Sequence, residues 1–174
     1  INMDPMQPAF AISYPKNYAA KIAQVVGLYS TLGMPRDTWA LNENKITYET
    51  FLQNSESIFA EREAILRNEL KKYKGGIFFF YFGASDSLQH MFWRFIDPEH
   101  PNFDKRLAEK CAGVIEEHYQ QLDRILGNIL DKYVDTDTLL IVLSDHGFTT
   151  FRRAVCINSW LIANGFMYLK NNEK

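Results

Sequence analysis

Two Asp/His pairs in this chain have the residue types and spacing of a metal site. Asp86 and His90 stand four positions apart, so in a helix both side chains leave one face. Asp145 and His146 are adjacent, and the permissive backbone of Gly147 allows a turn that directs both side chains inward. Carboxylate oxygen with imidazole nitrogen suits zinc, manganese or iron better than calcium or magnesium. Together the pairs predict a shared metal site.

Each pair also has a simpler interpretation. Asp86 can cap the helix that follows it, and His90 can be a histidine of the core. Asp145 can open an ordinary turn before Gly147. The two pairs are harder to explain separately, because each follows an apolar run of the same kind.

These apolar runs are residues 77–82 and residues 138–143, and neither shows polar alternation. Such runs are typical of strands covered on both faces. A long amphipathic stretch over residues 103–133 lies between them and predicts a helix. Strand, helix and strand in this order predict a parallel crossover and an α/β fold.

The carboxyl ends of parallel strands meet at one crevice, so both pairs should meet there. Ligand bonds of about 2 Å to ions about 4 Å apart put the nearest atoms of the pairs within roughly 8 Å. Helical spacing further predicts helices near residues 15–27, 48–73 and 158–164.

Composition excludes two classes of partner. The 174 residues carry 19 Lys and Arg against 21 Asp and Glu, so no basic surface is expected to hold nucleic acid. The longest apolar run is far shorter than the ~20 residues of a membrane span, and no signal peptide opens the chain. The location is left open, with the cytoplasm slightly favoured, since the absence of a signal peptide here does not identify the compartment.

The motifs resemble a known family. Ser144-Asp-His-Gly-Phe148, with Asp86-Ser-Leu-Gln-His90 upstream, resembles the type I phosphodiesterase/nucleotide pyrophosphatase branch of the alkaline phosphatase superfamily. The closer resemblance is to its predicted phosphohydrolase/phosphomutase group. In that group, an Asp-x-x-Gln-His-x-x-Trp segment precedes an Asp-Pro-x-His-Pro loop. In this chain the segment is Asp86 to Trp93, and the loop is Asp97 to Pro101.

The resemblance implies a three-layer α/β/α sandwich with a mostly parallel sheet and two divalent ions, zinc or manganese. Asp86 and His90 would hold one ion with a later histidine. Asp145 and His146 would hold the other with an early aspartate and a Thr or Ser nucleophile. Small phosphate esters would be the substrates, with phosphodiesters or nucleotides favoured, and the reaction would pass through a covalent phospho-enzyme.

The chain also departs from the family pattern. No histidine follows His146, and the first 70 residues contain neither a strand ending in aspartate nor a recognisable nucleophile. We therefore expect residues 1–174 to form a single partial domain that lacks the nucleophile and the last metal ligand. Such a domain should be inactive alone, and its exposed strand edges should favour self-association.

Other polar residues leave alternatives open. Arg152 and Arg153 are candidate phosphate contacts, because an Arg fork matches phosphate geometry, but they can equally be solvated or salt-bridged. His100 can pack in its loop or touch substrate. At the level of function, the alternatives to a hydrolase are a phosphomutase of the same superfamily and a non-catalytic binding module.

Overall fold

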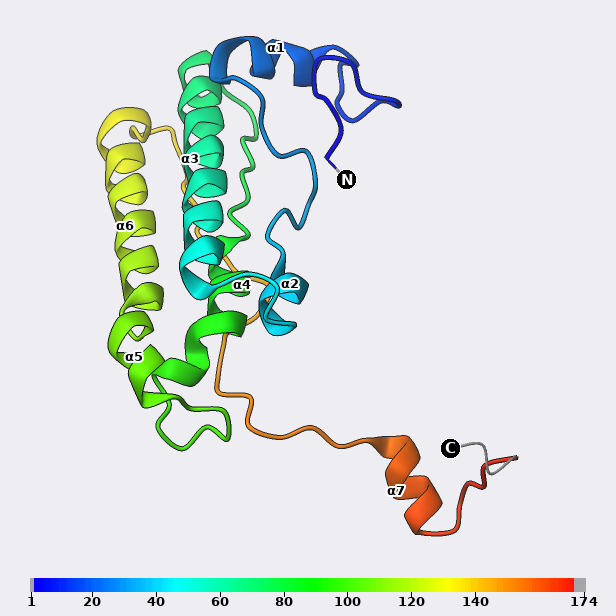
Figure 1. Ribbon diagram of the computed structural model, residues 1–174. Coiled ribbons are helices and arrows are strands. Elements are labelled where there is room, and N and C mark those ends of the chain that lie inside the picture. Colours follow the sequence, from blue (N-terminus) through cyan, green and yellow to red (C-terminus); the bar gives the residue numbers. More distant parts are fainter. Residues whose placement is uncertain (1, 171–174) are drawn as a thin grey trace.

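The computed structural model describes residues 2–170 and is helical throughout its ordered core (Figure 1). The helices are α1 (Tyr18–Val26), α2 (Thr38–Asn42), α3 (Tyr48–Lys72), α4 (Ala84–Phe92), the 3₁₀ turn η1 (Trp93–Phe95), α5 (Lys105–Cys111), α6 (Val114–Tyr133) and α7 (Ile157–Ala163).

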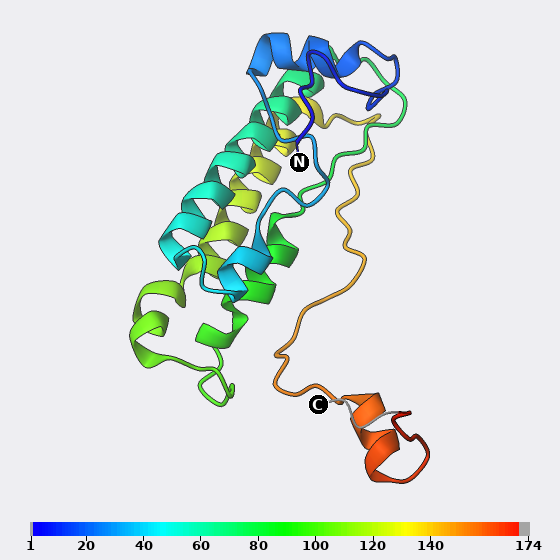
Figure 2. The same ribbon diagram turned by 45° about the vertical axis from the view of Figure 1, so that its right-hand side comes forward.

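The core lies between α3, α4 and α6. Phe51 on α3, Phe92 on α4 and Phe95 in η1 are its most deeply buried large side chains. Figures 1 and 2 show α3 and α6 side by side and running in the same direction. The Thr47 hydroxyl caps the start of α3 by accepting from the Thr50 N–H, which satisfies one of the free amides of the first turn.

The predicted helix over residues 103–133 is two helices. Asp104 begins α5 by accepting from the backbone N–H groups of Arg106 and Leu107. α5 ends at Cys111, and α6 starts after Gly113. The hydrophobic spacing continues across this break, which is why the sequence indicates one helix.

The predicted three-layer α/β/α sandwich is wrong. Within residues 2–170 there is no β-strand and no sheet. Residues 77–82 and 138–143 are extended, but no backbone hydrogen bond between described residues joins either one to another extended segment. A strand exists only when a second backbone pairs with it, and an apolar run does not reveal whether a pairing partner is present.

Residues 77–82 are also not covered on both faces. Phe78, Phe80 and Phe82 pack against the helical core, whereas Ile77 and Phe79 are 98% and 76% exposed. Successive side chains of this segment therefore alternate between the core and solvent, although all of them are apolar or aromatic. Leu139, Ile141, Val142 and Leu143 in the second segment are exposed as well.

The direction of the two extended segments matters for the site. In Figures 1 and 2, each one leaves the end of a helix, α3 or α6, and returns alongside the helices toward α4. Because α3 and α6 are parallel, their returning segments also run in the same direction. Residues just beyond the two segments consequently come to the same end of the helical layer.

Beyond the second segment, α7 lies apart from the other helices (Figures 1 and 2), and none of its residues is buried. Among the described residues, no helix combines the length and apolar character needed to cross a membrane.

Candidate metal site

α4 carries the first Asp/His pair on the face opposite its buried side. Leu88 and Phe92 lie in the core with Ala84, at positions i, i+4 and i+8 of one helical stripe. Asp86 and His90 are offset from this stripe by half a turn, so burial of the stripe turns them outward. The His90 Nε2 atom lies 3.3 Å from Asp86 Oδ1.

The second pair follows the extended segment that ends at Leu143. The Asp145 carboxylate accepts from the His146 backbone N–H at 3.1 Å, and the Ser144 hydroxyl donates to the His146 carbonyl at 2.6 Å. These local bonds accompany a bend in the backbone at Asp145. The bend permits two adjacent side chains to face the same side. Gly147 does not have a positive φ, so the special backbone freedom of glycine is not what produces this arrangement.

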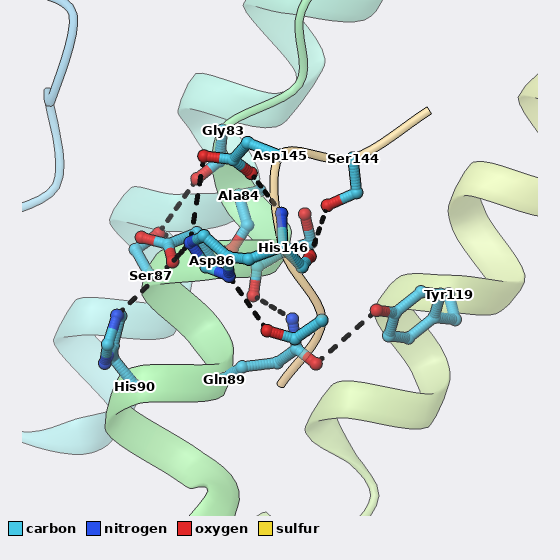
Figure 3. A network of polar contacts seen from close by, with 12 residues as sticks. Gly83, Ala84, Asp86, Ser87, Gln89, His90, Tyr119, Ser144, Asp145 and His146 are labelled. Carbon is cyan, nitrogen blue, oxygen red and sulfur yellow. Dashed lines mark hydrogen bonds and ion pairs between the residues drawn. The ribbon is translucent and has the colours of Figure 1, made fainter. Parts of the chain in front are cut away.

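The two pairs converge (Figure 3). The His146 Nε2 atom lies 3.9 Å from Asp86 Oδ1 and 3.7 Å from Asp145 Oδ2. The nearest atoms of the two pairs are thus well within the ~8 Å expected of ligands that share a two-metal site.

The imidazole of His146 is fixed by its own backbone. Its Nδ1 atom lies 2.8 Å from the Gly147 carbonyl oxygen, an acceptor, so Nδ1 carries the hydrogen and donates it. In the neutral ring this leaves the lone pair on Nε2, the atom that faces the carboxylates. Metal-binding histidines are commonly oriented in this way. The Gly147 carbonyl first, and the Asp145 and Asp86 carboxylates after it, raise the pKa of His146.

The donor set fits divalent metals in type but is not a complete cage. Within residues 2–170, no three His, Cys, Asp or Glu side chains are arranged to hold one ion. Each pair offers one carboxylate and one imidazole, which is half of a four-ligand zinc shell. All four side chains are substantially exposed to solvent, so additional ligands have access.

Phe148 joins the second pair to α4. Its ring packs edge-on against His90, with centroids 4.9 Å apart, and also contacts Trp93 at 5.1 Å. On α4 itself, Gln89 is buried and accepts from the Tyr119 hydroxyl of α6 at 3.4 Å. Residue type and spacing do not predict this contact of Phe148, although its position directly after Asp145-His146-Gly147 is a usable signal.

The two arginines differ in their surroundings. Arg152 forms ion pairs with Asp97 and Glu99, both at 2.7 Å. These carboxylates raise the pKa of Arg152, and the Arg152 guanidinium lowers the pKa of Asp97. Arg153 is exposed and forms no ion pair with another described residue. His100 is a loop residue whose Nε2 atom lies 2.9 Å from the Phe151 carbonyl oxygen.

Comparison with known proteins agrees with the motifs. A family model described as type I phosphodiesterase/nucleotide pyrophosphatase matches residues 7–173, a span that includes both Asp/His pairs and the segments leading to them. No curated protein and no solved structure gives a significant match. The chain therefore belongs to the type I phosphodiesterase/nucleotide pyrophosphatase family of phosphoester hydrolases, a branch of the alkaline phosphatase superfamily.

Proposed function

We propose that Asp86 with His90, and Asp145 with His146, each bind one divalent ion, zinc or manganese, of a metal-dependent phosphoester hydrolase. One observation carries the proposal. The His146 Nε2 atom faces Asp86 and Asp145 at 3.9 and 3.7 Å while its other ring nitrogen is fixed by a carbonyl oxygen.

Protein stability alone gives little reason for this cluster. Exposed ion pairs contribute about 0 to 1 kcal/mol, and these side chains are 41% to 87% exposed. A divalent ion carries a larger charge than the imidazole and would interact more strongly with both carboxylates, which favours ligand binding as the reason for the arrangement.

When bound, two such ions would activate a nucleophile and stabilise the leaving oxygen in attack on phosphorus. The residues of this chain would hold and orient the ions. Because each pair supplies only two ligands, we propose that other groups complete both shells and that this chain alone does not turn over substrate. Small phosphodiesters or nucleotides are the favoured substrates.

Titration of the chain with Mn²⁺ or Zn²⁺ in a calorimeter tests the metal site. We expect Asp86→Ala and Asp145→Ala to weaken binding by at least ~10-fold, because each removes one of two ligands from a shell. Asp131→Ala, which removes an exposed carboxylate of α6, is the matched control. Equal affinity in all four proteins would reject the site.

Activity is tested in a form of the protein that hydrolyses an aryl phosphate ester with added metal. There, Asp145→Ala should lower the rate by well over ~100-fold, because loss of a ligand empties or misplaces an ion. Retained activity would reject the assignment. Metal binding without hydrolysis in every form tested would instead favour a non-catalytic binding module.

A further inference from the structure

A second polar cluster lies where the loop after η1 meets the segment after Phe148. Arg152 donates to Asp97 through two nitrogens, from Nε to Oδ2 at 2.8 Å and from Nη2 to Oδ1 at 2.7 Å. Its Nη1 donates to Glu99 Oε2 at 2.7 Å. The Thr150 hydroxyl also donates to Asp97 Oδ2.

His100 adds a contact to the backbone of the same segment. Its Nδ1 atom accepts from the Asn102 backbone N–H at 3.1 Å, so the hydrogen of the neutral ring is on Nε2. Nε2 then donates to the Phe151 carbonyl oxygen at 2.9 Å. Three consecutive residues, Thr150 to Arg152, are therefore bonded to the loop that begins at Asp97.

These bonds connect the two halves of the candidate site. The loop continues directly from α4 and η1, which carry Asp86 and His90. The bonded segment continues directly from Asp145 and His146, which otherwise follow a segment of exposed residues. The Asp97 side chain is only 10% exposed, and a buried carboxylate needs its paired cation.

We propose that Asp97, His100, Thr150 and Arg152 form a clamp that positions Asp145 and His146 against α4. They are positioning residues, and Arg152, whose donors are engaged by carboxylates, acts in the clamp rather than on phosphate. The effect of the clamp on metal binding rests on the proposed function, whereas its effect on the position of residues 145–148 does not.

The test uses Arg152→Gln and Asp97→Asn, which remove the ion pair, and Arg153→Gln as the matched control. The first readout needs no metal: the nuclear Overhauser effect between the rings of His90 and Phe148, whose centroids are 4.9 Å apart. The second readout is Mn²⁺ affinity by calorimetry. The contact between Phe59 and His118 in the helical core, with centroids 5.2 Å apart, reports that each variant is folded.

We expect the His90–Phe148 signal to be lost in Arg152→Gln and Asp97→Asn, and Mn²⁺ affinity to fall by ~10-fold or more. Arg153→Gln should retain both. The double variant should be no worse than either single variant, because the two side chains act as one unit. If either clamp variant fails to fold, Thr150→Val provides a milder loss of one hydrogen bond and should weaken the signal.

An unchanged His90–Phe148 signal in folded Arg152→Gln would overturn the clamp. A lost signal with unchanged Mn²⁺ affinity would overturn its role in positioning the metal ligands. A lost signal in a protein that binds no Mn²⁺ even when unmodified would support the clamp and reject the metal site.

Discussion

α4 carries two of the four candidate ligands, and the other two directly follow the extended segment at residues 138–143, but the two regions are held in different ways. α4 is positioned by packing, because Leu88 and Phe92 are buried in the core. The extended segment has exposed apolar side chains, and contacts of Phe148 and Arg152 beyond its end tie it to the rest of the protein. One half of the site therefore depends on the hydrophobic core and the other half on a few specific contacts.

The largest expected difference is in stability. Phe92→Ala removes a fully buried ring and should lower the free energy of unfolding by about 3 to 5 kcal/mol. Ile141→Ala, at a side chain that is 64% exposed, should change it by no more than ~0.5 kcal/mol. Urea denaturation followed by circular dichroism measures both. Similar losses for the two variants would mean that the extended segment is packed in solution.

The next largest expected effect is on self-association of the chain. Exposed apolar side chains on an unpaired extended backbone favour pairing with another copy. If Ile141 is buried in such a contact, Ile141→Lys should weaken association by ~10-fold or more, since burial of this side chain is worth about 1.5 kcal/mol. Sedimentation velocity over a range of concentrations measures it. A chain that stays monomeric at every concentration contradicts the prediction.

A smaller effect concerns capping of α3. Thr47→Ala removes the hydroxyl that accepts from the Thr50 N–H and should cost ~1 kcal/mol in the free energy of unfolding. Thr149→Ala, an exposed threonine of the second region, is the matched control and should be near neutral. Equal midpoints of urea denaturation for the two variants would show that this cap contributes nothing to stability.

The two regions should also differ in the direction of their histidine titrations. Burial lowers the pKa of His118 in α6 from its ordinary value of 6.5, whereas the Gly147 carbonyl and nearby carboxylates raise that of His146. In an NMR titration, His118 should therefore gain its proton below pH 6.5 and His146 above it. The reverse order would contradict the described surroundings of both rings.

The consequence for stability follows from proton binding. Between pH 6.5 and the lowered pKa of His118, the unfolded chain binds the proton more tightly than the folded chain, so stability falls as the pH falls. His118→Leu should reduce this dependence. The raised pKa of His146 has the opposite sign: its contribution is present below pH 6.5 and is lost as the pH rises through the folded value.

Several local features were predictable from sequence. The i,i+4 spacing of Asp86 and His90 determines that both leave one face once Ala84–Phe92 is helical, because helical geometry is local. The existence of α1, α3, α6 and α7 followed from apolar periodicity, although the break between α5 and α6 did not. Residue type and spacing alone predict both Asp/His pairs as candidate metal ligands, and their role in metal binding stays a prediction.

The tertiary structure decided the rest. Whether residues 77–82 become a strand depends on a pairing partner, which no local pattern encodes, and the predicted sheet was wrong for that reason. The 3.9 Å approach of His146 to Asp86 depends on the parallel course of α3 and α6 and on Phe148 packing against His90. The surroundings of Arg152 depend on a loop 55 positions away in sequence, a contact that residue type alone cannot distinguish from solvent or phosphate.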